Sequence, residues 1–167
     1  MSGKKTQESR QVFYEADIER VDQILTEFLR QSKARCAMLI DREGYMITRQ
    51  GSTRSFDNDT ISALVAGSFA ATKEMARLLG EDEFSVLYHQ GKKENIQMTL
   101  VGDRILLTVI FDEQTTLGMV RLYAKEGAKR LVHQLYQERD KNAPTPECNL
   151  GTEFQDSAKD KLESLFS

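Results

Sequence analysis

The segment over residues 95–123, NIQMTLVGDRILLTVIFDEQTTLGMVRLY, constrains the fold more than any other part of the chain. Apolar and polar residues alternate over residues 96–101, which predicts a strand. Gly102-Asp103 predicts a two-residue hairpin turn, because glycine adopts the positive φ that such a turn needs. Residues 105–111 are almost uninterruptedly apolar, and this pattern indicates a central strand that is covered on both faces.

A helix follows this hairpin, because Thr115 or Thr116 can accept a hydrogen bond from a free backbone N–H and apolar residues then recur at helical spacing. Short links between consecutive strands imply antiparallel pairing. The sequence therefore predicts an α+β fold, an α/β sandwich in which one five-stranded antiparallel sheet is flanked by helices. The expected elements are a helix (17–31), two strands (35–41 and 45–49), a helix (60–79), three strands (84–90, 95–101 and 105–111) and a helix from residue 117.

Composition excludes several classes of function. The 167 residues are 40% hydrophobic and carry a net charge of −3, which argues against nucleic acid as the main partner. No apolar run approaches the ~20 residues of a membrane span, and the polar N-terminus lacks the apolar core of a signal peptide. Cys36 falls in a predicted buried strand and Cys148 in a predicted linker, so a disulfide is not expected. These features predict a cytoplasmic protein.

The long helix over residues 60–79 carries apolar residues on two sides. Asp57 or Asp59 can cap its start, and Gly80 ends it. One side is large and apolar (Ile61, Leu64, Val65, Met75, Leu78 and Leu79), and the other is small (Ala63, Ala66, Gly67, Ala70 and Ala71). The small side either packs on the sheet or gives a flat surface to a partner. Glycine inside a helix costs ~1 kcal/mol relative to alanine, which favours the partner surface.

The C-terminal part of the chain changes character after residue 139. Pro144 and Pro146 predict an extended linker over residues 140–155, because proline lacks an N–H and restricts the preceding residue. Residues 156–167 then place Leu162, Leu165 and Phe166 on one edge of a short helix. So short a helix is marginal alone. It either docks back onto its own domain or forms a linear motif that binds a partner.

The sequence lacks the recognised patterns of catalytic and cofactor sites. It contains no phosphate-binding glycine motif, and neither His89 nor His133 has a companion at a metal-ligand spacing. Asp41 and Asp112 each follow an apolar strand, where turn formation or capping explains them. We therefore expect no catalytic residue, no metal and no cofactor, and the sequence favours an interaction module over an enzyme.

Three segments together resemble the Roadblock family, the dynein light-chain type. They are MLIDREG at residues 38–44, the alanine-rich helix, and LVGDR at 100–104 continuing to DEQTTLGMVR at 112–121. Within this family the likeness is to the bacterial MglB group, which regulates the Ras-like polarity GTPase MglA, and it extends over about residues 14–137. The acidic tail that ends in Leu-Phe-Ser is also similar to that group.

The resemblance implies a homodimer that joins two sheets at the edge strand over residues 84–90, together with the long helix. The dimer residues expected there are Phe84, Val86, Leu87 and Tyr88. It also implies that two copies bind one MglA-type GTPase across the long helices and the tail. The residues carried over for that contact are Ala63, Ala66, Gly67, Ala70, Lys73, Glu74, Leu162, Leu165 and Phe166. Lys73-Glu74 departs from the small residues that are usual in the MglB group.

The implied function is a non-catalytic GTPase activator, with promotion of nucleotide exchange left open. Such a protein acts by holding the GTPase in the conformer whose own residues orient the attacking water. The alternatives are a Roadblock-type scaffold without effect on hydrolysis and, in third place, an enzyme or small-ligand sensor on a profilin-like fold. The expected organisation is a disordered N-terminus (1–13), a Roadblock-type domain (14–139), a linker (140–155) and a docking motif (156–167), in a cytoplasmic protein with concentration at a cell pole implied.

Overall fold

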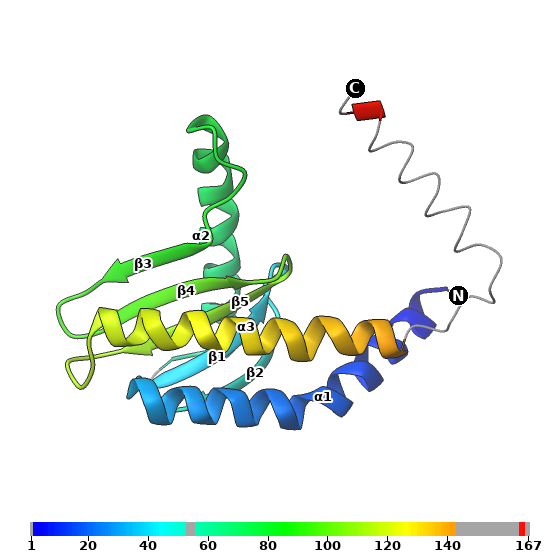
Figure 1. The fold of residues 1–167 in the computed structure, drawn as a ribbon, viewed down its shortest axis with the longest axis horizontal. Helices are drawn as coiled ribbons and strands as arrows, with labels where there is room; N and C mark the ends of the chain where they lie inside the picture. Colours follow the sequence, from blue (N-terminus) through cyan, green and yellow to red (C-terminus); the bar gives the residue numbers. More distant parts are fainter. Residues whose placement is uncertain (1, 53–55, 143–163, 166–167) are drawn as a thin grey trace. The chain divides into compact units, whose positions relative to one another are not determined.

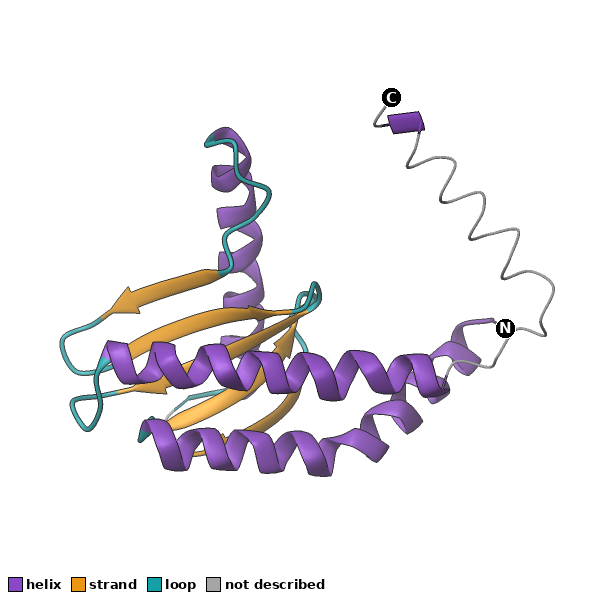
Figure 2. Cartoon of the chain, in the orientation of Figure 1, coloured by secondary structure: helices purple, strands orange, loops and turns teal. Residues whose placement is uncertain are grey.

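The structure is a computed structural model that describes residues 2–52, 56–142 and 164–165, with side chains described from Asp17 onward and, before the tail, as far as Tyr136. The element order is helix, two strands, helix, three strands, helix (Figures 1 and 2), which confirms the predicted α+β class. The elements are α1 (Ser2–Ser32), β1 (Cys36–Asp41), β2 (Met46–Gly51), α2 (Asn58–Leu78), β3 (Val86–Gln90), β4 (Asn95–Val101), β5 (Ile105–Phe111) and α3 (Leu117–Asn142). Residues 1–137 form one compact unit.

All strand pairs are antiparallel, in the order β2-β1-β5-β4-β3. Every residue of β5 is buried, as its apolar sequence predicts. The longest connection in sequence joins β1 to β5, where Cys36 lies opposite Ile110 and Asp41 opposite Ile105. The sheet edges are β2 and β3, so β3 has an unpaired outer edge within the described chain.

Two hydrophobic clusters occupy the two faces of the sheet, because successive residues of a strand point to opposite sides. Ala37 and Leu39 of β1 belong to the cluster under α1 and α3, which includes Leu25 and Leu131. The neighbouring strand residues form the other cluster with α2, whose members are Cys36, Met38, Ile40, Val65, Phe69, Met98, Leu106 and Ile110. Helices α1 and α3 lie side by side over one face, and the C-terminal half of α2 projects beyond the sheet (Figure 1).

The turn between β4 and β5 corrects one prediction. Val101 and Ile105 lie opposite each other, so the connection has the three residues between them rather than two. Gly102 has φ +66°, where L side chains are strained. The Tyr136 hydroxyl of α3 accepts hydrogen bonds from the N–H groups of Asp103 (3.2 Å) and Arg104 (3.3 Å). A distant tyrosine therefore holds this turn, and the local sequence does not contain that information.

Several predicted boundaries also differ from the structure. Helix α1 begins at Ser2, although residues 1–13 were expected to be disordered and the helix was expected from Asp17. The N-terminal residues after Gly3 include neither glycine nor proline, and Lys, Gln, Glu and Arg are good helix formers. Strand β3 starts two residues later than expected. Helix α3 continues to Asn142, three residues into the predicted linker, because no proline precedes Pro144. The remaining predicted linker, residues 143–155, lies outside the described residues.

Candidate partner-binding surface

Helix α2 begins at Asn58, two residues before the predicted start, and its cap is one of the two predicted aspartates. Asp57 is its N-cap and accepts a hydrogen bond from the N–H of Asp59 (3.1 Å) and another from the Thr60 hydroxyl (2.8 Å). These bonds stabilise the carboxylate and lower the pKa of Asp57, with the Thr60 hydroxyl as the largest cause. The helix ends at Leu78, and Gly80 follows with φ +82°.

Helix α2 buries only some of its apolar residues. Ser62, Val65, Ala66, Phe69 and Ala76 are buried. They lie on one side of the helix at 3.6 residues per turn. The Arg42 guanidinium lies 5.9 Å from the centre of the Phe69 ring and pairs with Glu83, which lies between α2 and β3. The N-terminal half of α2 is thereby fixed to the sheet.

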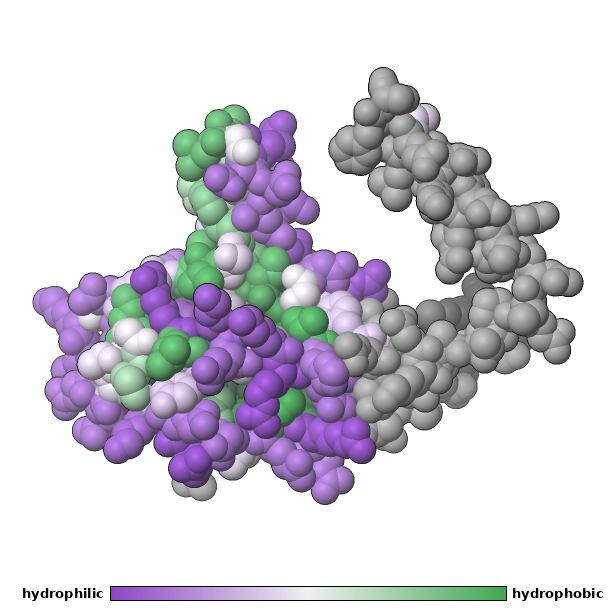
Figure 3. All heavy atoms as spheres, viewed as in Figure 1, coloured by the Kyte–Doolittle hydropathy of each residue, from purple (hydrophilic) through white to green (hydrophobic). Residues whose placement is uncertain are grey.

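Large apolar residues occupy the opposite side of α2 and face away from the sheet. The exposed fractions are 65% for Leu64, 52% for Met75, 80% for Leu78 and 73% for Leu79. Figure 3 shows hydrophobic side chains gathered over the projecting part of α2. Clusters of this kind mark interaction sites more often than isolated exposed residues do. We call Leu64, Met75, Leu78 and Leu79 the apolar ridge. The sequence pattern grouped these residues with Val65, which the structure places on the buried side.

The small residues form a third side of α2, between the buried side and the apolar ridge. Ala63, Gly67 and Ala70 are exposed there, and Lys73 and Glu74 are exposed as well. A Cβ added to Gly67 would meet nothing within 4 Å, so no contact inside the chain requires glycine at this position. We call Ala63, Gly67 and Ala70 the small-residue stripe. It is exposed within the described chain and carries no side chain larger than a methyl group.

Ala66 does not belong to this exposed surface. It is only 8% exposed, and its Cβ lies 3.7 Å from where a Cβ of Gly44 would stand, in the β1–β2 turn. For Ala66, packing inside the domain is therefore the observed role. A long side chain at this position would displace α2 from the turn rather than test a partner contact.

Strand β3 adds an open edge. Val86 is 39% exposed, whereas Leu87 and Tyr88 are half-buried and pack into the two clusters. Tyr88 stacks on Phe111 with the ring centres 6.1 Å apart. Phe84 is half-buried and precedes the strand. Of the four residues expected at a dimer contact, Val86 is the one with an exposed side chain, and the rest of an edge contact would come from backbone N–H and C=O groups.

Most residues of the C-terminal tail lie outside the part of the chain that the structure describes. Leu162 and Phe166 are not described, and Leu165 is helical and 78% exposed. No group of three or more metal-ligating side chains exists within the described residues. No helix in that part of the chain is both long and apolar enough to cross a membrane.

The described chain is a layered domain with an open strand edge and an exposed apolar helix face. The Roadblock/LC7 domain family matches residues 20–111, and the chain belongs to that family. A solved structure of Myxococcus xanthus MglB is 34% identical, covers 71% of this chain and 96% of its own, and superposes with a TM-score of 0.68. The gliding protein MglB from Thermus thermophilus is 36% identical, with 71% and 90% covered and a TM-score of 0.67.

A further structure, described as MglB with a tetrameric arrangement, gives the same 36% identity, coverage of 71% and 90%, and TM-score of 0.67. A comparison with curated protein sequences finds no significant match. The chain is therefore a Roadblock/LC7 protein that is similar to MglB.

Proposed function

We propose that this protein regulates a Ras-like GTPase of the MglA type, and that it binds the GTPase as a homodimer with two copies to one GTPase. The observation that carries the proposal is α2, whose small-residue stripe and apolar ridge are both exposed within the described part of the chain. Similarity to MglB proteins at 34–36% identity supports a GTPase as the partner.

The two surfaces of α2 suit two different contacts. Burial of apolar area at ~25 cal/mol per Å² makes the apolar ridge suitable for contact with the second copy of the chain. The small-residue stripe has no side chain beyond a methyl group, so the backbone of a partner can approach closely. We therefore assign the ridge and Val86 to the dimer, and Ala63, Gly67, Ala70, Lys73 and Glu74 to the GTPase.

The chemistry expected of such a regulator is conformational. GTP hydrolysis depends on positioning and on electrostatic stabilisation of the transferred phosphoryl group. A protein that binds the hydrolysis-competent conformer more tightly than the other conformers raises the rate without supplying a catalytic group. We infer that α2 acts in this way.

The tail adds a tethered contact in this proposal. Leu162, Leu165 and Phe166 would dock as a short helix into a groove of the GTPase, away from the main surface. Tethering gives such a motif an effective concentration of roughly millimolar. Because one GTPase offers one copy of the groove, a single tail of the dimer binds it.

The test is GTP turnover and binding by an MglA-type GTPase, with and without the full chain. Ala70→Arg should reduce binding by about a hundredfold, because it places a long charged side chain on a flat contact. Gln114→Arg adds the same charge in the loop before α3 and should leave binding and turnover unchanged. A chain lacking residues 156–167 should bind about tenfold more weakly.

Three outcomes would overturn parts of the proposal. Turnover that the chain leaves unchanged, with binding intact, would establish the scaffold alternative. Equal binding by the Ala70→Arg and Gln114→Arg variants would place the partner elsewhere. Sedimentation of a 19.0 kDa monomer at micromolar concentration would remove the dimer.

A further inference from the structure

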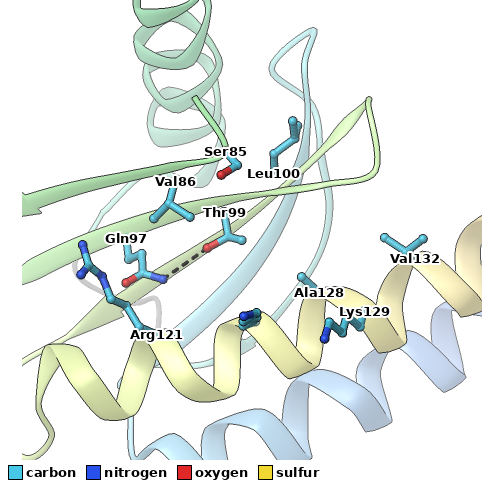
Figure 4. Close-up of a pocket in the computed structure, with 10 residues that line it drawn as sticks. Ser85, Val86, Gln97, Thr99, Leu100, Arg121, Ala128, Lys129 and Val132 are labelled. Carbon is cyan, nitrogen blue, oxygen red and sulfur yellow. Dashed lines mark hydrogen bonds between the residues drawn. The ribbon is translucent and has the colours of Figure 1, made fainter. Parts of the chain in front are cut away.

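A groove lies on the side of the sheet opposite α2, between α3 and the β3–β4 strands (Figure 4). Its volume is about 670 Å³. Val86, Ala128 and Val132 give it apolar walls, and Gln97 and Thr99 of β4 lie on its strand side. The groove exists because α3 packs over β5 and the adjoining strands. This packing leaves the part of that sheet face nearest β3 uncovered.

One edge of the groove is strongly basic. Arg121, Lys125 and Lys129 lie four residues apart on α3, so they form one row along the helix. None of the three forms an ion pair within the described residues, and none of the described residues that line the groove is acidic. This concentration of positive charge stands out in a chain whose net charge is −3.

A buried polar group on the strand side lacks a partner. The Gln97 side chain is 1% exposed, and its amide nitrogen donates to the Thr99 hydroxyl oxygen at 3.3 Å. Its amide oxygen Oε1 has no hydrogen-bond partner among the described residues. Leaving a buried acceptor unpaired is costly, so such a group calls for a specific explanation.

A peptide fits this combination better than a simple anion does. The N–H and C=O groups of a peptide backbone can satisfy the spare group of the Gln97 amide in either orientation. A carboxylate has no hydrogen-bond donor for the Gln97 Oε1 atom. Acidic side chains of a peptide would instead pair with the row of basic residues on α3. Small aliphatic side chains suit the walls formed by Val86 and Ala128.

We propose that this groove binds an acidic peptide segment of a partner protein, with a backbone amide at Gln97, an aliphatic side chain between Val86 and Ala128, and carboxylates on Arg121, Lys125 and Lys129. The site is separate from the GTPase surface of α2, because α2 packs on the other face of the sheet, and it shares Val86 with the proposed dimer contact. A partner could therefore occupy the groove while a GTPase is bound to α2.

The experiment measures binding of fluorescent peptides to the full chain by anisotropy. The probes are acetylated and amidated peptides of the pattern Asp-Glu-X-Ala-Asp-Glu, with X as Val, Leu, Ile or Phe, and their charge-reversed Lys-Arg counterparts. We expect the acidic peptides to bind and the reversed peptides not to bind. Binding should weaken as salt increases, because exposed charge pairs are screened.

Two variants locate the site, each with its own check. Lys125→Glu should weaken binding about tenfold, whereas Lys92→Glu makes the same charge change on the β3–β4 turn and should have no effect. Gln97→Leu should weaken binding at least about fivefold. The melting temperature of the Gln97→Leu variant should stay equal or rise, because the substitution removes an unpaired buried acceptor. If Gln97 had only a structural role, weaker binding would not be accompanied by unchanged or higher stability.

Other outcomes overturn the proposal. Equal affinity of the Lys125→Glu and Lys92→Glu variants would place the peptide elsewhere. Absence of acidic-peptide binding below millimolar concentration would remove the site, as would binding to phosphatidylserine vesicles without binding to peptides. The Ala70→Arg variant should bind the peptides normally, so failure of the GTPase proposal and failure of this one are distinguishable.

Discussion

Helices α2 and α3 pack on opposite faces of one sheet and use their apolar residues in different ways. Val120, Ala124, Leu131 and Leu135 of α3 are at most 3% exposed, so its main apolar row is buried within the chain. Met119 and Leu122 are the exceptions, with exposed fractions of 41% and 52%. On α2 the buried row includes Ser62 and two alanines, and the apolar ridge points to solvent. Helix α3 therefore completes a core, whereas α2 has more apolar surface than its own sheet can cover.

The comparison is tested most strongly by removing one leucine from each helix. Leu131→Ala on α3 should lower the free energy of unfolding by about 2–5 kcal/mol, because it leaves a cavity at a fully buried site. Leu78→Ala on α2 should change it by about 0.5 kcal/mol or less, since 80% of that side chain is exposed. Urea unfolding below the concentration at which the protein self-associates measures both. Similar losses for the two variants would show that α2 is covered within its own chain.

A smaller effect comes from adding a side chain at a glycine of each helix. A Cβ on Gly127 of α3 would lie 3.8 Å from Phe28 Cδ2 of α1, so Gly127→Leu overpacks the contact and should cost about 1–3 kcal/mol. Gly67→Leu on α2 enters open space and should leave thermal stability equal or higher. Differential scanning calorimetry gives both values. A destabilised Gly67→Leu variant would mean that the small-residue stripe is already occupied.

The smallest effect concerns the caps. Helix α2 begins at the Asp57 carboxylate, and α3 begins at Thr116, whose hydroxyl oxygen accepts the N–H of Met119 at 3.3 Å. Because hydrogen bonds lower the folded-state pKa of Asp57, its stabilising effect is present above the unfolded-state pKa and is lost as pH falls through the folded-state pKa. Amide exchange in the first turn of α2 should therefore accelerate on acidification, relative to α3.

Asp57→Asn provides the control for the cap. Asparagine is an equally good N-cap and does not titrate in this range, so the variant should keep α2 protected and abolish the relative pH dependence. Thr116→Ala should loosen the first turn of α3 by the same amount at every pH. A pH dependence that persists in the Asp57→Asn variant would assign it to another group.

Local sequence was sufficient for the elements whose causes are local. Strand β5 and the starts of α2 and α3 each depend on residues that are neighbours in sequence. The structure confirms β5 as predicted. It also confirms Asp57 and Thr116, each of which was one of two predicted caps. The same holds for the element order, which follows from periodicity and turn residues.

Local sequence was insufficient for the candidate site, because the cause lies elsewhere in the chain. Helix α2 is apolar on more than one side, and Met38, Ile40, Met98 and Ile110 select the side that becomes buried. Those residues come from three strands that are separate in sequence. The spacing of Val65 and Phe69 with Ala76 is the signal that could have identified the buried side. The groove beside α3 depends on how far that helix covers the sheet, which no pattern within α3 contains.

The pairing of β1 with β5 has a consequence for the order of folding. The β1–β2 hairpin and the β3–β4–β5 meander each join neighbouring strands through short turns, so each can form quickly. Joining them closes a loop that contains β2, α2, β3 and β4, and its entropic cost must be met before the ladder between Cys36 and Ile110 contributes. We expect this closure to limit the folding rate. Substitutions along that ladder should then slow folding, whereas substitutions on the outer sides of α2 should leave the rate unchanged.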